Sequence, residues 1–276
     1  MKRFCVFAAF LVFALTGQAV LADEMPGGSD EELLSFVAPS VLQKARAGDR
    51  IAQHLIAGAF LGGKLTQRDV PKAIYWARLA ADQGLTMAQV LLARQYQKGE
   101  GVDQNDEKAA ALYKLASDQD DPIAALRLAS LYQTGRGVSI DYEKSTALLL
   151  LAAKQNIPAA AHYYADALWV GRGVPKDAAK GVKWYHKAAD LGWPVSARML
   201  AGLYFSGQIV PLDRVEASKW MQIAAAILAR KDPLTRKYMN AIWPKLSEAE
   251  RDAGRKKALA FLKSHAESFK KAEILR

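Results

Sequence analysis

The sequence has very few of the residues that build disulfides and metal centres. It contains one cysteine and four histidines in 276 residues. Cys5 lies in the apolar N-terminal stretch, so the rest of the chain has no cysteine for a disulfide or for a metal. The histidines are His54, His162, His186 and His265, and none lies within ligand spacing of another. We therefore expect no metal and no cofactor.

Patterns typical of catalysis are equally scarce. No serine stands in a nucleophile elbow, and the carboxylates are scattered along the chain. The glycine pair Gly99 and Gly101 recurs later in the same register, which indicates turn glycines and not a phosphate-binding loop. From these absences we expect a protein that is not an enzyme.

The one long apolar run lies at the N-terminus. Lys2 precedes the run Cys5–Leu15, and Val20–Ala22 supplies the small residues that cleavage needs. This pattern predicts a signal peptide over residues 1–22, cleaved near Ala22, and a periplasmic or secreted product. A membrane anchor is the alternative, but the run is short for a bilayer span, which needs about 20 residues.

The middle of the chain repeats itself with a period of 36 residues. Five gapless copies start at Ala52, Ala88, Ala124, Ala160 and Ser196. Each copy has a large apolar residue at its ninth position and a glycine at its twelfth. Each also has an alanine near its end, namely Ala80, Ala116, Ala152, Ala188 and Ala224. This period predicts a stacked repeat array over residues 52–231.

The second copy shows how one unit is built. Ala88–Gln97 has apolar residues at helical spacing, and Gly99 and Gly101 then permit the left-handed backbone that ends a helix. Asp106 is expected to cap a second helix over Lys108–Asp118, which has its own apolar face. Each unit is therefore a helix-turn-helix, and neighbouring units must stack to bury both faces.

This unit resembles the Sel1-like repeat, a relative of the tetratricopeptide repeat. The matching residues of the second copy are Leu92, Ala93, Tyr96, Gly99, Gly101, Val102, Lys108, Ala109 and Ala116. The first copy departs from the pattern with Leu65, and the fifth with Ile209, each in place of the second glycine. The resemblance implies an all-α, right-handed superhelical solenoid of helix-turn-helix repeats with helical caps.

Two segments flank the array. Residues 23–51 are interpreted as a polar leader and an N-terminal half-repeat, in which Leu42, Ala45 and Gly48 match the second half of a unit. Residues 232–276 are predicted to form a basic helical cap, with a helix over residues 234–242 and a capped helix that starts near Ser247. The apolar stripe expected to cover the last repeat is Leu259, Leu262, Ala266 and Phe269.

Basic residues are concentrated C-terminal to the array. The chain has 38 basic and 28 acidic residues, and residues 230–276 contain 13 basic and 6 acidic ones. This segment is either the solvated side of a cap or a surface for weak contact with anionic lipid headgroups or polysaccharide. No nucleic-acid partner is expected, because the array has no basic groove with interleaved aromatics.

One stripe of the first helices varies between copies. By the tetratricopeptide resemblance, this stripe lines the concave groove of the array and binds a partner peptide or domain. The predicted groove residues are His54, Leu61, Arg94, Gln97, Gln133, His162, Asp166, Trp169, Arg198 and Phe205. Trp169 and Phe205 are the favoured aromatic anchors. The alternatives are that the two rings pack between neighbouring first helices, or that the stripe varies because it has no function.

Together these features predict a non-catalytic interaction scaffold or regulator in the bacterial envelope. The resemblance implies a protein partner, such as a membrane sensor or an envelope-assembly component. The alternative is an envelope enzyme, or an enzyme inhibitor, that acts on peptidoglycan or a β-lactam.

Overall fold

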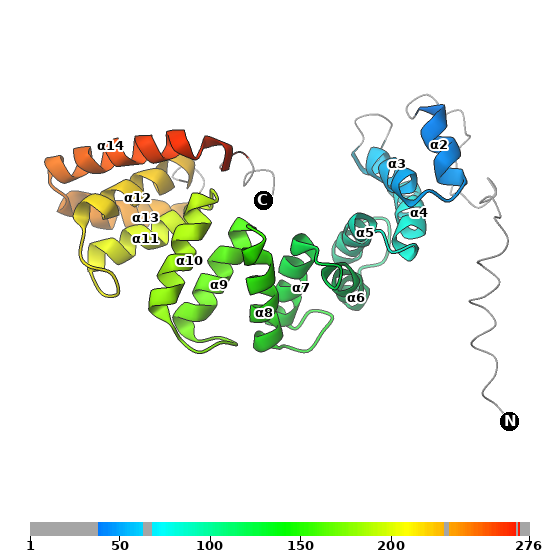
Figure 1. The fold of residues 1–276 in the computed structure, drawn as a ribbon, viewed down its shortest axis with the longest axis horizontal. Coiled ribbons are helices and arrows are strands. Elements are labelled where there is room, and N and C mark those ends of the chain that lie inside the picture. The colour runs from blue at the N-terminus through cyan, green and yellow to red at the C-terminus, as the bar shows by residue number, and fades with distance from the viewer. Residues whose placement is uncertain (1–37, 63–67, 229–231, 269, 271–276) are drawn as a thin grey trace. The chain divides into compact units, whose positions relative to one another are not determined.

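The computed structural model describes residues 38–62, 68–228, 232–268 and 270. The predicted signal peptide with Ala22, the leader, Gly63, Leu65 and Phe269 lie outside the described residues. Every regular element in the described part is a helix, and the helices follow one another in consecutive pairs (Figure 1). The chain divides into two units, residues 1–119 and residues 120–276.

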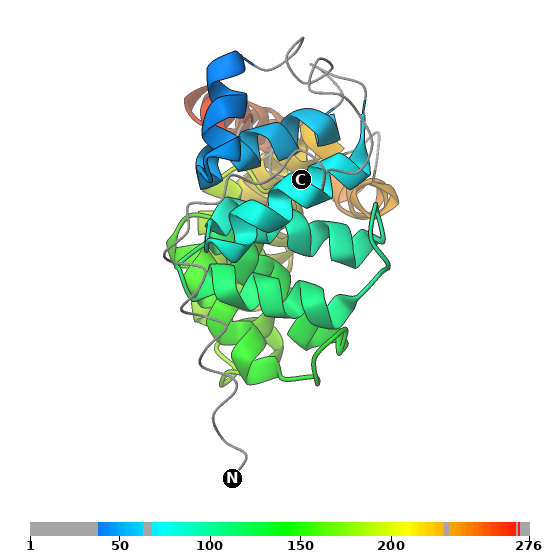
Figure 2. The same ribbon diagram turned by 90° about the vertical axis from the view of Figure 1, so that its right-hand side faces the viewer.

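The first unit consists of a single short helix followed by two helix pairs. Its helices are α2 (Pro39–Arg46), α3 (Arg50–Gly62), α4 (Val70–Asp82), α5 (Thr86–Lys98) and α6 (Asp106–Ser117). Within this unit each helix packs against the next one along the chain (Figure 2). Leu42 and Ala45 of α2 are buried in the cluster formed with α3 and α4, so α2 covers the open side of the first pair.

The second unit contains three helix pairs and the C-terminal segment. The pairs are α7 (Pro122–Thr134) with α8 (Tyr142–Lys154), α9 (Pro158–Val170) with α10 (Ala178–Asp190), and α11 (Pro194–Ser206) with α12 (Arg214–Leu228). The segment that follows comprises α13 (Pro233–Ile242), a 3-10 turn (Trp243–Lys245) and α14 (Glu248–Ser264). This segment lies against α11 and α12.

In the second to fifth repeats, the loop inside each helix pair is held by the same set of hydrogen bonds. In the second repeat, Gly99 adopts φ 68° and its amide donates to the Gln95 carbonyl, which ends α5. The Asn105 amide then donates to the Tyr96 carbonyl at 2.9 Å, and the Asn105 side chain accepts from the Lys108 amide at 2.8 Å. The cap of α6 is therefore Asn105. The prediction of Asp106 was wrong by one residue, because Asp106 is already the first residue of the helix.

The repeated alanines explain how closely the helices approach. Ala80, Ala116, Ala152, Ala188 and Ala224 are each fully buried. A methyl side chain leaves room for the neighbouring helix at positions where a larger residue would overfill the core. This accounts for the strict recurrence of alanine that the sequence shows.

Buried glutamines add a second link between helices of the first unit. Gln53 donates to the Ala45 carbonyl of α2 at 3.0 Å and accepts from the Gln83 side chain at 2.8 Å. One repeat later, Gln89 accepts from the Gln119 side chain at 2.9 Å. These bonds satisfy polar groups inside the stack, which would otherwise destabilise the fold.

The C-terminal helix α14 packs along α12. Ser247 and Glu250 form a reciprocal capping box at its start, as the sequence predicts. The predicted apolar stripe was wrong at Leu259, which is 61% exposed, and at Ala266, which is exposed, whereas Leu262 packs against the core as predicted. The contact face runs through Gly254, Ala258, Phe261 and Leu262.

Candidate interaction site

Four of the predicted groove residues lie in the first unit, on α3 and α5. His54 and Leu61 are half-buried on α3, and burial lowers the pKa of His54. Gln97 is also half-buried and accepts a hydrogen bond of 3.0 Å from the Tyr113 hydroxyl of α6. Arg94 is exposed on α5. Of these four, Arg94 is therefore the one that presents its charge to solvent.

Gln133 and Trp169 are half-buried in the second unit, on α7 and α9 respectively. Trp169 packs against the core cluster that contains Tyr185, Leu200 and Met221. Its ring thus contributes to contact between neighbouring helices, which is the alternative that the sequence leaves open for it.

His162 is a core residue, with 6% of its surface exposed. Its Nδ1 lies 2.9 Å from the Ser196 hydroxyl of α11, and its Nε2 lies 3.6 Å from an Asp166 carboxylate oxygen. The other Asp166 oxygen accepts a hydrogen bond of 2.5 Å from the Tyr185 hydroxyl. Burial lowers the pKa of His162 despite the opposing effect of Asp166, so the ring is neutral at pH 7.

Ser196, His162 and Asp166 are the residue types of a hydrolase triad, but their geometry does not suit catalysis. Ser196 is fully buried between α9 and α11. A nucleophile must reach the substrate carbonyl, and a hydroxyl without access to solvent cannot do so in this conformation. The arrangement instead joins α9, α10 and α11 through buried polar contacts.

Arg198 attaches the C-terminal segment to α11. Its guanidinium forms an ion pair with Asp232, and its side chain is 11% exposed. Asp232 in turn caps α13 by accepting hydrogen bonds from Leu234 and Thr235. Hydrogen bonding from the Thr235 hydroxyl, together with the nearby Arg198 charge, lowers the pKa of the Asp232 carboxyl. Arg198 is thus engaged inside the chain, although the sequence pattern placed it on a groove wall.

Between α11 and α13 lies a cleft of about 270 Å³, which we call the α11–α13 cleft. Its lining residues are Gly202, Phe205, Lys237, Tyr238, Ala241, Ile242 and Lys245. Phe205, a predicted groove residue, forms part of its wall from α11. Gly202 of α11 also lines the cleft, and the other lining residues come from α13 and the turn after it, which the sequence analysis did not connect with the site.

The cleft combines aromatic walls with positive charge. The Lys245 ammonium lies 5.8 Å from the centre of the Phe205 ring, and Lys237 is exposed at the rim. Neither lysine forms an ion pair with another described residue. The cleft therefore offers an apolar seat with cations beside it, which suits an apolar side chain flanked by acidic ones.

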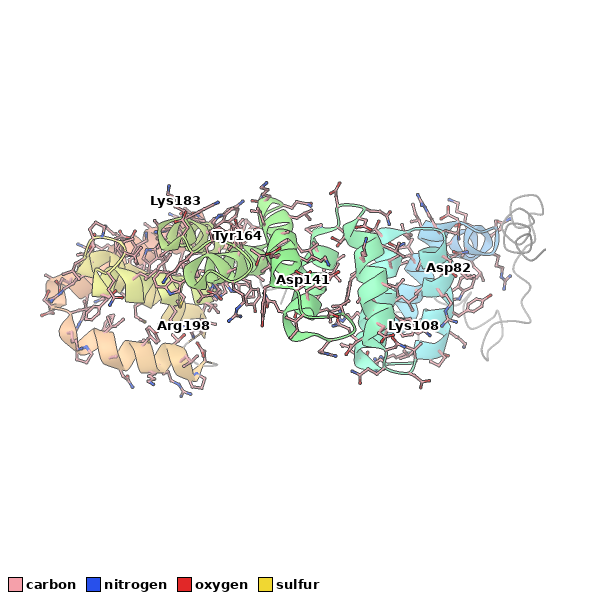
Figure 3. The ribbon with its side chains drawn as sticks, turned by 90° about the horizontal axis from the view of Figure 1, so that it is seen from below. Asp82, Lys108, Asp141, Tyr164, Lys183 and Arg198 are labelled. Carbon is pink, nitrogen blue, oxygen red and sulfur yellow. The ribbon has the colours of Figure 1, made fainter. Side chains whose placement is uncertain are left out.

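Control positions for this cleft are available in the same unit. Lys183 is exposed on α10. In Figure 3 Lys183 is labelled at the upper edge of the ribbon. Neither Lys183 nor any other residue of α10 lines the α11–α13 cleft, so a probe at Lys183 samples a different part of the unit.

Two further features are absent from the described residues. No group of three or more His, Cys, Asp or Glu side chains in this part of the chain has the geometry to hold a metal ion. No helix among the described residues has the length and apolar character needed to cross a membrane.

The consecutive helix pairs define an all-helical repeat protein. The Sel1 repeat model matches residues 50–85, 86–121, 122–157, 158–193 and 194–226, and the chain therefore belongs to the Sel1 repeat family. Proteins with these repeats generally act as scaffolds for protein interaction, and their fold is typically non-catalytic. The matched segments begin where α3, α5, α7, α9 and α11 begin.

Solved structures with the same repeats resemble this chain. A protective antigen of uropathogenic Escherichia coli with an SLR fold is 28% identical, with a TM-score of 0.70, over 80% of this chain and 48% of its own. A Sel1 repeat protein from Oxalobacter formigenes is 27% identical, with a TM-score of 0.64, over 78% of this chain and 64% of its own. The chain thus corresponds to only part of each relative. No curated protein matches the chain.

Proposed function

We propose that this protein is a non-catalytic interaction protein of the bacterial envelope that holds a partner segment in the α11–α13 cleft. The observation that carries the proposal is the pairing of Phe205 and Tyr238 with Lys237 and Lys245 around one cleft. An exposed pocket with aromatic walls is where interfaces concentrate their binding energy.

The charge of the surroundings favours an acidic partner. Residues 230–276 contain 13 basic and 6 acidic residues, and the cleft lies partly within this segment. A partner segment with an apolar anchor between acidic residues would fill the cleft and meet the two lysines. The positive segment would also speed the encounter with such a partner.

The envelope location rests on the sequence of residues 1–22, which has the order of a cleavable export signal. Sequencing the N-terminus of the protein recovered from the periplasm tests this part directly. We expect a new N-terminus near Asp23. Recovery of an intact Met1 in the membrane fraction would contradict export with cleavage.

The partner site can be tested by placing a photo-crosslinking amino acid at Ala241, an exposed cleft residue, in living cells. We expect a defined adduct from this position and none from the same amino acid at Lys183. The variant Lys237→Glu with Lys245→Glu should weaken the adduct by about tenfold, as expected for the loss of two charge-assisted contacts.

The matched control reverses two lysines elsewhere in the same segment. Lys256 and Lys263 are exposed on α14, and Lys256→Glu with Lys263→Glu changes the net charge by the same amount. This control should leave the adduct intact. If both double variants reduce the adduct equally, the basic segment acts through its overall charge, and the cleft is not the binding site.

A further inference from the structure

A lysine above an aromatic ring recurs at equivalent positions of the repeats. The ammonium group lies 5.4–5.6 Å from the ring centre in each case. The pairs are Lys72 with Phe60, Lys108 with Tyr96, and Lys144 with Tyr132. Because the position repeats, its surroundings can be compared between copies.

The second repeat differs from its neighbours in the charge that faces this lysine. In the first repeat, Lys72 forms an ion pair of 3.2 Å with Asp69, the residue that caps α4. In the third, Lys144 pairs with the capping Asp141 at 2.9 Å. The second repeat has Asn105 as its cap, and Lys108 forms no ion pair with any described residue. Asn105 therefore caps α6 as the aspartates cap α4 and α8, but it carries no negative charge.

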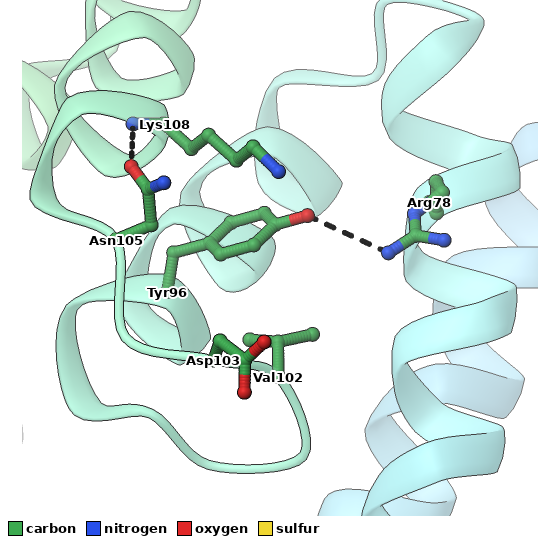
Figure 4. A pocket seen from close by; sticks show the side chains of 6 residues that line it. All are labelled: Arg78, Tyr96, Val102, Asp103, Asn105 and Lys108. Carbon is green, nitrogen blue, oxygen red and sulfur yellow. Dashed lines mark hydrogen bonds between the residues drawn. The ribbon is translucent and has the colours of Figure 1, made fainter.

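A second cation reaches the same ring from α4. The Arg78 guanidinium lies 3.5 Å from the Tyr96 hydroxyl and forms no ion pair with another described residue. Figure 4 shows the Arg78 guanidinium and the Lys108 ammonium both directed toward the hydroxyl end of Tyr96. The Arg78 guanidinium, the Lys108 ammonium and the Tyr96 hydroxyl are all hydrogen-bond donors, and they lie on the same side of the loop.

These groups surround a cavity of about 360 Å³ lined by Arg78, Tyr96, Val102, Asp103, Asn105 and Lys108 (Figure 4). The loop that carries Val102 and Asp103 is fixed, because Gly101 (φ 75°) lies directly against α4. A Cβ there would stand 2.4 Å from the Val70 side chain. Asp103 forms no ion pair with either cation. In Figure 4 its carboxylate lies across the Tyr96 ring from Lys108.

We propose that this cavity, which we call the Arg78–Lys108 pocket, binds a carboxylate group from an acidic peptide segment. A carboxylate accepts hydrogen bonds only, and it matches the fork of an arginine and the point charge of a lysine. The one negative charge in the lining, Asp103, leaves the pocket with a net charge of about one positive unit, which suits a single carboxylate better than a phosphate dianion. That the carboxylate belongs to a polypeptide rests on the proposed function, whereas the pocket itself does not.

The test uses the whole exported chain, residues 23–276, and a defined probe. The probe is the capped peptide acetyl-Gly-Glu-Glu-Gly-amide, and its effect on the amide NMR signals of the loop over residues 99–105 is titrated. The glutamine version of the peptide, inorganic phosphate and glucuronate serve as comparison ligands. We expect the acidic peptide to shift these signals, with an affinity that falls as salt is raised, because the pocket is open to solvent. Glucuronate should shift them less.

The decisive variant is Asn105→Asp. Aspartate caps the equivalent helices of other repeats, so the fold should be retained. The new carboxylate should form an ion pair with Lys108, as Asp69 does with Lys72 and Asp141 with Lys144. We expect the affinity for the acidic peptide to fall by about fivefold or more in Asn105→Asp and in Arg78→Gln, the effect of losing one charged partner. Lys144→Gln, the matched change one repeat later, should have no effect.

Two results would overturn the proposal. The first is an unchanged affinity in Asn105→Asp. The second is an equal response to the glutamine peptide or to phosphate, which would show that the pocket does not select a carboxylate. A stronger response to glucuronate than to the peptide would assign the carboxylate to an acidic sugar and overturn the peptide assignment. Charge reversal at Lys237 and Lys245 should not alter peptide binding here, so this outcome is separate from that of the α11–α13 cleft.

Discussion

The substitution Gly254→Ala should weaken the packing of α14 on α12, although alanine is normally the better residue in a helix. Gly254 lies in the interior of α14, where this change normally stabilises a helix by roughly 0.5–1 kcal/mol. Here, however, a Cβ would stand 2.4 Å from the Ser218 hydroxyl, 2.5 Å from the Ser218 Cβ and 2.9 Å from the Lys219 backbone nitrogen. The last of these is main chain and cannot rotate away.

The size of the effect follows from these distances. Carbon atoms in contact prefer a separation of about 3.5–4.0 Å, so α14 would have to move away from α12 by roughly 1 Å. Overpacking of this kind costs about 1–3 kcal/mol, which exceeds the gain in helix propensity. We expect a net loss of about 1–2 kcal/mol, which corresponds to a decrease in Tm of roughly 2–8 °C for a chain of this size.

Thermal unfolding followed by circular dichroism measures this loss. Ser218→Gly removes two of the three close atoms, so in a double-mutant cycle it should recover part of the stability lost in Gly254→Ala. Ala260→Gly, at an exposed site of the same helix, measures the propensity effect by itself. A Gly254→Ala protein as stable as the parent, or more stable, would refute the close approach of the two helices.

Three further outcomes are expected. Trp169→Ala should lower the Tm, because the ring packs in the core of the second unit; an unchanged Tm would make Trp169 an open surface residue after all. Gln53→Ala should cost about 1 kcal/mol by removing its hydrogen bonds to the Ala45 carbonyl and the Gln83 side chain, while the exposed Gln43→Ala should be neutral; equal effects would argue against the glutamine link. Burial lowers the pKa of His54, His162 and His186, so the unfolded chain binds more protons and the free energy of unfolding should fall as the pH drops below about 6.5. A Tm that stays constant from pH 7.5 to pH 5, or a pH profile that is not flattened by His162→Gln, would contradict this linkage.

The periodicity of the sequence was sufficient to predict the helix pairs, because every unit solves the same geometric problem. The turn glycines Gly99 and Gly135 take the left-handed conformation that the pattern required. The register also contained the correct cap of α6, since Asn105 falls on the same repeat position as Asp141. Comparison between copies therefore indicates Asn105, and not Asp106, as the cap of α6.

The C-terminal segment could not be predicted to the same degree, because it occurs once and has no copy for comparison. Hydrophobicity selected Leu259, but contact between α12 and α14 depends on how closely the two backbones approach. That approach is set by small residues four positions apart, Gly254 and Ala258. Amphipathicity reports which residues are apolar, whereas the docked face is decided by shape.

The α11–α13 cleft could be predicted only in part, for the same reason. Arg198 and Phe205 were predicted as groove residues because they vary within a repeated stripe, but the sequence does not show that α13 covers this part of α11. The docking of α13 depends on an ion pair between residues 34 positions apart, Arg198 and Asp232. No local pattern encodes that contact. The α11–α13 cleft is therefore visible only in the folded chain.

The repeats also make exceptions informative. The lysine that faces the aromatic ring in the first three copies is replaced by Glu216 in the fifth, and Glu216 bonds to Lys257 of α14 at 2.7 Å. Burial opposes ionisation of Glu216, yet hydrogen bonds from Lys257 and Lys219 outweigh it and lower the pKa. The reversed charge thus has a structural purpose, because it attaches the cap. Asn105 is an exception of the opposite kind, because it retains the structural role of its position and removes only the charge. Asn105 leaves the fold intact and leaves the Lys108 ammonium without an ion pair to any described residue. Such a change is explained by the binding of a partner and not by the stability of the fold.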